Sequence, residues 1–270
     1  MTHHPVPEPA EAAEPGRGPV VEPEGELTLQ GRIMPASNAT FLGEIDGVSV
    51  VYKPVAGERP LWDFPDGDLA GREVAAYLVS EVTGWDVVPH TWLRDGPHGV
   101  GMCQLWQEPD EEQEAVTLVA EGDVPPGWRH VFDGLDGRDQ AVSLIHEDTE
   151  QLRRMAVFDV VVNNADRKGG HVLAMSDGHR YGVDHGIAFH HEHKLRTVLW
   201  GWQGEPLTDD EEQTVRRIRA SLADGLADRL AQHLTDLEIE ALDRRCRRLL
   251  GTGRLPRSGN DWPSIPWPPF

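Results

Sequence analysis

Two short polar segments, each beside an apolar run, carry the residues best suited to chemistry. Asp166 follows three consecutive valines at 160–162, and Asp184 precedes the apolar run at 187–189. Because apolar runs of this kind bury, each carboxylate is expected to be held rigidly at the edge of a core. Phosphoryl transfer uses such a pair: one carboxylate orients the attacking hydroxyl, and the other holds a divalent cation on the phosphates.

A nucleoside-triphosphate site needs three further parts, and the chain offers them upstream of the two aspartates. These parts are a turn that presents N–H groups to phosphate, a lysine on a neighbouring strand, and an acid that fixes the lysine. Lys53 is the strand-end lysine, and Glu73 is the acid on a predicted helix. The turn consists of Ser37, Asn38, Ala39 and Thr40.

Each member of this set has an ordinary structural explanation when it is taken alone. Lys53 fits an unremarkable strand end, and Glu73 fits a solvated helix charge. Asp166 with Arg167 fits a surface turn held by an ion pair, and Asp184 before a glycine fits an Asx turn. The ordered set is much more specific than any member, and it favours phosphate chemistry.

Composition excludes several classes of partner. The formal net charge of -21 repels nucleic acid and anionic membranes, whereas it suits cationic partners. Cys103 and Cys246 form no CxxC pair, so free thiols in a reducing cytoplasm are expected. Residues 1–20 lack the apolar stretch of a secretory signal, and no run of about 18 apolar residues predicts a membrane span.

Hydrophobic periodicity predicts strands in the first part of the chain and helices in the last part. Strands are expected at 27–33, 41–44, 48–54, 87–93 and 100–106, with a helix at 69–82. Further on, a buried helix is expected at 150–162, a hairpin at 172–175 and 180–183, and helices from Thr208 onward. Capping boxes of Thr208 with Glu211 and of Thr235 with Glu238 mark two helix starts.

These elements divide the chain into a tail, two lobes and a second tail. Residues 1–26 are rich in Pro and Glu and are expected to be disordered. The first lobe spans 27–107, and the second spans 108–251 and includes a lobe connection at 108–140. Residues 252–270 carry Trp and Pro without periodicity, and we expect them to lie against the body as an extended strap.

Several segments resemble a known kinase superfamily. Residues 159–167 look like its catalytic loop, 181–189 like its metal-binding segment, and 71–77 like its first-lobe helix. The family is the phosphatidylinositol 3- and 4-kinases, with type II phosphatidylinositol 4-kinase-like proteins the most similar. With gaps, the resemblance runs from about 33 to 207. We expect the chain to belong to a bacterial family that has the same distant similarity to these kinases.

The resemblance implies a role for each matching residue. Lys53 would pair with the α- and β-phosphates of ATP, and Glu73 would hold Lys53. Asp166 would be the catalytic aspartate, with Arg167 beside it in the loop, and these two residues and Lys53 are the expected catalytic residues. Asp184 would bind Mg²⁺. The hinge that faces the adenine would be formed by Gln104, Leu105, Trp106 and Gln107.

Two departures from the family pattern affect this expectation. The phosphate turn at 35–40 contains no glycine, although Ser, Asn and Thr can still present N–H and hydroxyl groups. His171 falls where the family has a metal-binding asparagine. Because Mg²⁺ prefers oxygen ligands and imidazole suits softer metals, the site holds one metal through Asp184, or uses Mn²⁺, or has reduced activity.

Three other groups of residues have weaker signals. The histidines at 185–193 fit a polar segment that lines the cleft, with zinc binding or acceptor binding as alternatives. Arginines at 216–219 and 244–248 fit solvated helix faces, with a docking patch as the alternative. Trp200 and Trp202 fit lobe packing better than an acceptor pocket.

The sequence therefore predicts an α+β, two-lobed, protein-kinase-like fold with ATP-dependent phosphotransferase activity. The acceptor is expected to be a soluble small molecule or a protein hydroxyl, because nothing in this acidic chain would anchor it to lipid. One alternative is a nucleotide-binding pseudokinase that regulates a protein partner, held through the acidic connection at 107–123. A second alternative is nucleotidyl transfer on the same fold.

Overall fold

The computed structural model describes residues 22–34, 38–59, 61–64, 67–259 and 263–270. An antiparallel sheet with strand order β1-β2-β3-β5-β4 forms the first part of the chain. Its strands are β1 (Thr28–Arg32), β2 (Phe41–Ile45), β3 (Val48–Pro54), β4 (Thr91–Gly96) and β5 (Gly99–Leu105). The tight turn between β2 and β3 has φ of 52° at Asp46 and 82° at Gly47. Asp-Gly supplies that backbone geometry, so the predicted hairpin is confirmed.

The strand predicted at 87–93 starts later than expected. Strand β4 begins at Thr91, although Val87 and Val88 are buried. Pro89 has no N–H to donate to a ladder, so the buried valines before it pack without pairing. The hydrophobicity of Val87 and Val88 therefore predicted their burial correctly, but it did not predict whether they pair in a strand.

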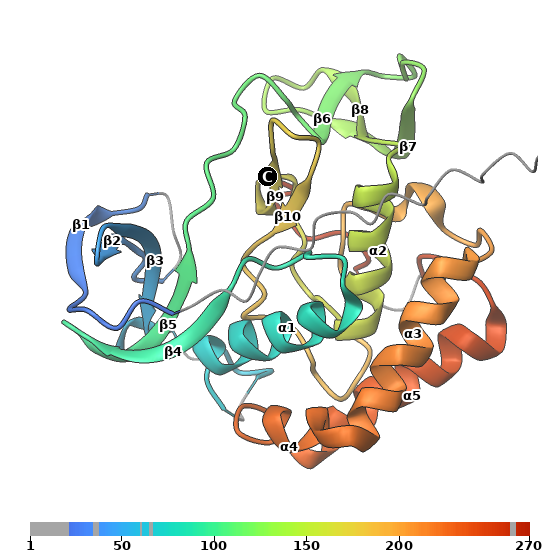
Figure 1. Cartoon of the computed structure of the whole chain (residues 1–270). Helices are drawn as coiled ribbons and strands as arrows, with labels where there is room; N and C mark the ends of the chain where they lie inside the picture. The colour runs from blue at the N-terminus through green and yellow to red at the C-terminus, as the bar shows by residue number, and fades with distance from the viewer. Residues whose placement is uncertain (1–21, 35–37, 60, 65–66, 260–262) are drawn as a thin grey trace, which may run out of the picture.

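Helix α1 (Leu69–Thr83) lies between the sheet and the helical part of the chain (Figure 1). It starts at Asp68, whose side chain accepts the N–H of Gly71, and it ends at Gly84, which has φ of 66°. A residue with positive φ at this position favours glycine. The apolar side chains of α1 belong to the large core of the later helices, whereas β1–β5 have a small separate core. Glu73 on α1 is thus held between two cores.

A second sheet lies where the sequence predicted only a lobe connection. Its strands are β6 (Val116–Ala120), β7 (Trp128–Leu135) and β8 (Ala141–Glu147), in the order β6-β8-β7. The lobe connection expected at 108–140 thus contains β6 and β7, strands that the sequence analysis did not predict. The central strand is well buried at 143–146, whereas the residues of the two edge strands are mostly half-buried or exposed. Gly- and Pro-rich loops between short edge strands obscured the alternation.

The remaining elements form the helical part and a small hairpin. They are α2 (Glu150–Val162), β9 (Val172–Ala174), β10 (Arg180–Gly182), α3 (Asp209–Ser221), a π-helical turn (Leu222–Leu226), α4 (Ala227–Leu230) and α5 (Asp236–Thr252), with 3-10 turns at Val55–Gly57, Gly169–His171 and Trp200–Trp202. Both predicted capping boxes are present. The helix expected to continue after α3 is interrupted at Gly225, whose φ is 89°.

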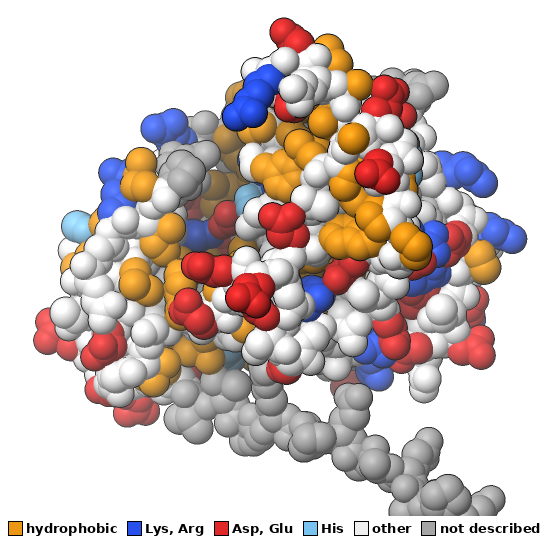
Figure 2. Space-filling view, turned by 90° about the horizontal axis from the view of Figure 1, so that it is seen from above, with side chains coloured by type: hydrophobic (Ala, Val, Ile, Leu, Met, Phe, Trp, Pro, Cys, Tyr) orange, Lys and Arg blue, Asp and Glu red, His pale blue; other side chains and the backbone are white. Residues whose placement is uncertain are grey.

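The architecture is thus α+β, with strands early and helices late, as predicted. Seen from above, the surface is hollowed between the sheet β1–β5 and the rest of the molecule, with charged side chains at the bottom of the hollow (Figure 2). No helix within the described ranges is long and apolar enough to cross a bilayer. Cys103 and Cys246 are both free and buried.

Candidate phosphate and metal site

Lys53, Glu73 and Asp184 meet although they are far apart in the sequence. The ammonium of Lys53 lies 2.8 Å from Oε1 of Glu73 and contacts Oδ1 of Asp184. Strand β3 delivers the lysine, α1 delivers the glutamate, and the segment after β10 delivers the aspartate. The structure therefore brings together three residues that the sequence analysis placed in one site.

Glu73 also fixes the backbone beside Asp184. Its second oxygen, Oε2, accepts the N–H of His185 at 2.8 Å, and Glu73 is 3% exposed. Asp184 has φ of 60°, which is uncommon for a residue with a side chain and costs about 1–3 kcal/mol. The glutamate thus holds both the lysine and the strained turn that presents the Asp184 carboxylate.

Electrostatics keeps Lys53 and Asp184 charged. Burial acts to lower the pKa of Lys53, but the charges of Asp184 and Glu73 outweigh burial and raise that pKa above its ordinary value. The charge of Lys53 in turn holds the pKa of Asp184 well below its usual range. A fixed cation beside an ionised carboxylate is what a polyphosphate with its divalent cation would require.

His171 connects the two aspartates of the sequence analysis. Its Nδ1 lies 2.9 Å from the backbone oxygen of Asp166, so Nδ1 carries the proton and Nε2 is left with a lone pair. That Nε2 lies 3.4 Å from Oδ2 of Asp184. The Asp166 carboxylate is 3.1 Å from the ammonium of Lys168 and is one-quarter exposed.

The donor atoms of His171 and Asp184 face each other closely enough to serve one cation. Imidazole nitrogen and carboxylate oxygen together suit Mn²⁺ better than Mg²⁺. No group of three or more His, Cys, Asp and Glu side chains in the described part of the chain is placed to hold a metal ion. The other ligands would have to come from phosphate and water, as is usual for ions that accompany nucleotides.

Arg167 lies in the interior, fully buried, and its guanidinium does not reach the solvent where a substrate would bind. It forms an ion pair with Asp159 on α2 at 2.9 Å and donates to the backbone oxygens of His171 and Val183. The sequence analysis placed Arg167 among the catalytic residues. Its contacts suit a positioning residue that ties the Asp166 loop to the Asp184 segment.

Asp159 is a fully buried residue beside the site whose contacts the sequence analysis did not predict. Besides Arg167, its carboxylate accepts the side-chain amide of Asn164 at 3.0 Å and the hydroxyl of Thr197 at 3.1 Å. Asn164 in turn accepts the N–H of Asp166 at 3.0 Å. The available signal was a charged residue inside the apolar run at 155–162 of α2, because a fully buried carboxylate requires partners.

The other nucleotide-binding expectations have less support from the geometry. Ser37 lies outside the described residues, and Asn38, Ala39 and Thr40 form a turn whose Ala39 N–H already donates to Gly57 O. The side chain of Gln104 is buried and donates to Thr91. The N–H groups of Leu105 and Trp106 donate within the first sheet, to His90 O and Ser49 O. A role for these residues toward nucleotide stays a prediction.

The histidine-rich segment after Asp184 is a fixed loop. Asn163 donates to the backbone oxygens of His190 and Glu192 and accepts the N–H of Lys194. A cavity of about 170 Å³ adjoins this loop and α1. The expected lobe-packing role of Trp202 fits its burial in the large core.

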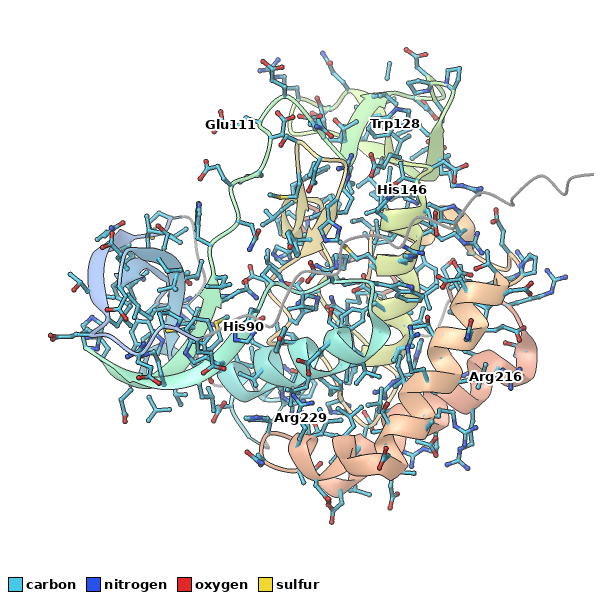
Figure 3. The ribbon with its side chains drawn as sticks, viewed as in Figure 1. His90, Glu111, Trp128, His146, Arg216 and Arg229 are labelled. Atoms are coloured by element: carbon cyan, nitrogen blue, oxygen red, sulfur yellow. The ribbon has the colours of Figure 1, made fainter. Side chains whose placement is uncertain are left out.

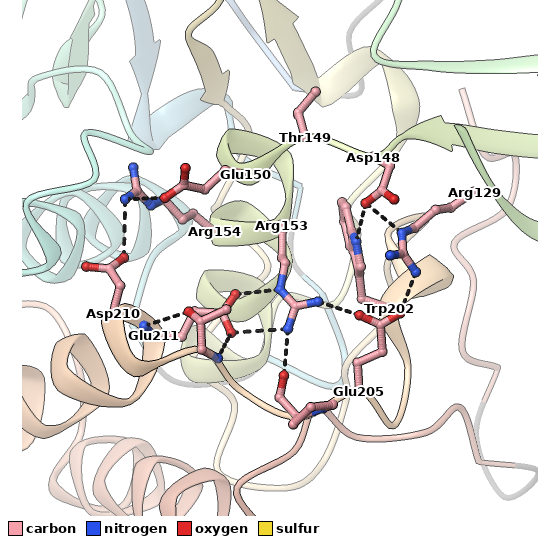
Figure 4. A pocket seen from close by; sticks show the side chains of 12 residues that line it. Arg129, Asp148, Thr149, Glu150, Arg153, Arg154, Trp202, Glu205, Asp210 and Glu211 are labelled. Atoms are coloured by element: carbon pink, nitrogen blue, oxygen red, sulfur yellow. Dashed lines mark hydrogen bonds and ion pairs between the residues drawn. The ribbon is translucent and has the colours of Figure 1, made fainter. Parts of the chain in front are cut away.

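A larger cavity, of about 540 Å³, lies away from this site, between the start of α2 and the start of α3 (Figure 4). Its three arginines all have carboxylate partners: Arg129 pairs with Asp148, Arg153 with Glu211, and Arg154 with Asp210. Paired in this way, the arginines are neutralised and hold the second sheet, α2 and α3 together. The cavity therefore contributes to packing and carries none of the predicted chemistry.

The fold and site define an α+β protein with a lysine–glutamate–aspartate site at the junction of its two parts. No protein-family model matches the chain. "Protein Rv2133c" of Mycobacterium tuberculosis (strain ATCC 25618 / H37Rv) is 51% identical, over 92% of this chain and 93% of that protein. The chain therefore belongs to the same family as Rv2133c.

One solved structure is similar at a lower level. The Helicobacter pylori proinflammatory kinase CtkA has 11% sequence identity and a TM-score of 0.46, with 86% of this chain and 93% of that chain covered. A TM-score at this level does not establish a shared fold. The chemistry of the site therefore has to be argued from the contacts within this chain.

Proposed function

We propose that this protein is an ATP-dependent phosphotransferase with a kinase-like site. The contact of Lys53 with both Glu73 and Asp184 is the observation that carries the proposal. A strand lysine held by a helix carboxylate, beside an aspartate suited to a metal ion, is the arrangement that protein kinases require before phosphoryl transfer. The phosphatidylinositol kinase resemblance of the sequence agrees with it but is not needed for it.

Each residue then has a defined task in the reaction. Lys53 binds the α- and β-phosphates, and Asp166 orients the acceptor hydroxyl and takes its proton. The acceptor oxygen forms the new bond to the γ-phosphorus while the bond to the ADP oxygen breaks. A divalent cation held by Asp184 and His171 would neutralise the phosphate charge.

The acceptor is proposed to be a soluble small molecule or a protein hydroxyl. The net charge of -21 disfavours an anionic lipid surface, and it suits a neutral or cationic acceptor. We also propose a cytoplasmic location, because the two cysteines form no CxxC pair and residues 1–20 lack the apolar stretch of a secretory signal. Neither nucleic acid nor a membrane anchor is part of the proposal.

The test compares wild type with Asp166→Asn and Asp184→Asn in ATP binding and turnover, with Mg²⁺ and with Mn²⁺. We expect Asp166→Asn to lower turnover by about 10²–10⁴-fold while ATP affinity is retained. Asp184→Asn should weaken metal-dependent binding as well as turnover, and Mn²⁺ should support more turnover than Mg²⁺. The matched control is Asp177→Asn in the β9–β10 turn, which should leave both unchanged. Turnover insensitive to both site variants would refute the proposal.

A nucleotide-binding pseudokinase is the second candidate, and His171 favours it. An imidazole stands where an oxygen ligand would serve Mg²⁺, and the Asp166 carboxylate is already paired with Lys168. This candidate predicts saturable ATP binding with no turnover by wild type under either metal. Nucleotidyl transfer is separated from both by intact mass, because an adenylate adds far more mass to the product than a phosphate does.

A further inference from the structure

The last described segment, residues 263–270, crosses the loop that carries Asp166. Its end lies beside β9 in Figure 1. The N–H of Gly169 donates to the backbone oxygen of Pro269 at 2.8 Å. The ring of Phe270 lies so close to Gly169 that a Cβ at this position would overlap it. The backbone N–H of Gly169 is therefore bonded to this segment, and the Phe270 ring occupies the space that a side chain at position 169 would need.

The segment has a fixed half and an exposed tip. In the fixed half, the backbone oxygen of Ser264 accepts the N–H of Thr197 at 3.0 Å and the indole N–H of Trp200 at 2.8 Å. Ile265 packs against the large core, and Pro266 is buried. In the tip, residues 267–270, Trp267 is 76% exposed and Phe270 is 47% exposed. The anchor is thus secure, whereas the tip has little buried area to hold it.

The position of the tip bears on the proposed reaction. Gly169 follows Lys168, whose ammonium pairs with the Asp166 carboxylate at 3.1 Å. An acceptor that reaches the Asp166 carboxylate beside Lys168 passes the part of the loop that Lys168 and Gly169 form. The tip contacts the loop at Gly169, the residue next to Lys168.

We propose that residues 267–270 form a displaceable cap over the acceptor-approach surface of the Asp166 loop, and that the cap must leave before an acceptor is phosphorylated. The inference rests on the proposed phosphotransferase function and adds its regulation. One hydrogen bond and one partly exposed ring hold the cap only weakly, so open and closed molecules coexist. We expect the cap to be closed in about nine-tenths of the molecules and open in the rest. The cap thereby limits the access of an acceptor to Asp166 and leaves Lys53 free to bind nucleotide.

The experiment removes the tip and keeps the anchor, with a chain that ends after Pro266. We expect ATP affinity to be unchanged and turnover to rise about tenfold, measured as ATP hydrolysis and as transfer to myelin basic protein. Phe270→Ala should raise turnover in the same direction. Trp267→Ala is the matched control, because it removes an exposed aromatic ring of the tip and keeps both Pro269 and Phe270, which contact Gly169. Hydrogen exchange at the Gly169 amide should accelerate in the shortened chain and not in the control.

The outcomes separate this inference from the function on which it rests. Equal turnover in wild type and the shortened chain, or an unprotected Gly169 amide in wild type, overturns the cap and leaves the phosphotransferase standing. Absence of ATP binding in every form overturns the phosphotransferase itself. ATP binding without turnover in either chain overturns the cap and favours the pseudokinase.

Discussion

Glu73 shows how one side chain can organise a whole site. One of its oxygens holds the ammonium of Lys53, and the other accepts the backbone N–H of His185. An ionised carboxylate can accept both bonds, whereas an amide can accept on one side only. Loss of the negative charge also removes part of what keeps Lys53 charged in a buried place.

Substituting Glu73→Gln should therefore weaken the site more than its small change in shape suggests. In the variant, the amide N–H₂ group replaces one of the two accepting oxygens. It must therefore face a donor, either the ammonium of Lys53 or the N–H of His185. A hydrogen bond to a charged group contributes about 1.5–3 kcal/mol, so we expect turnover to fall by about ten- to a hundredfold. Steady-state ATP turnover measures it. Glu81→Gln, on the exposed face of the same helix α1, should leave turnover unchanged. An equal loss of turnover in that variant would mean that the charge of the helix, and not the contact of Glu73 with Lys53, is what matters.

At the scale of elements, Arg167 joins three parts of the chain through one side chain. Its guanidinium contacts α2 through Asp159, the backbone at the start of β9, and the backbone after β10. Both members of the ion pair are fully buried. Burying the two charges is costly, and the surrounding hydrogen bonds from Asn164 and Thr197 offset that cost. The pair therefore serves to specify how the two loops are placed.

Arg167→Lys should destabilise the fold strongly, because a lysine has one donor centre and cannot replace the planar set of contacts. Breaking a buried pair costs about 3–5 kcal/mol, and urea unfolding followed by tryptophan fluorescence measures the loss. Arg154→Lys is the matched control. Its partners Glu150 and Asp210 are both exposed, so the loss there should stay below about 1 kcal/mol. Similar losses at the two positions would contradict a central role for Arg167.

At the scale of the whole molecule, buried histidines link stability to pH. His146 lies on β8 of the second sheet (Figure 3) and is fully buried. Its Nδ1 donates to Glu147 O, and its Nε2 accepts the N–H of Gly201 at 3.0 Å, so the ring is held neutral. Burial is the main cause that lowers the pKa of His146 to about 4.

The unfolded chain protonates this ring near its ordinary pKa of about 6.5, whereas the folded protein resists protonation down to about 4. Between those values the unfolded state binds more protons, so the free energy of unfolding falls as pH falls. His146 should contribute a loss of up to about 3 kcal/mol over this window. Thermal unfolding from pH 7 to 4.5 measures it. His146→Gln should flatten the dependence and the exposed His98→Gln should not; identical slopes in all three proteins would rule out the assignment.

Much of the local structure could be predicted from the sequence. The strands flanking Asp46-Gly47, helix α2 and both capping boxes depend on neighbours within a few residues, and they appear as expected. The second sheet escaped prediction because its edge strands β6 and β7 are mostly half-buried or exposed, so burial imposes little hydrophobic pattern on their sequences. The division into lobes at 107 and 251 stays a prediction.

For the candidate site, sequence determined residue types and their order, and tertiary structure decided which of them meet. Lys53, Glu73 and Asp184 were proposed from their residue types and their order along the chain, and the resemblance to kinases implied their roles. That Arg167 is interior, that His171 presents Nε2 to Asp184, and that residues 263–270 cross the Asp166 loop all depend on contacts between distant segments. Such contacts are chosen by how whole elements pack, and no local pattern in the chain records them.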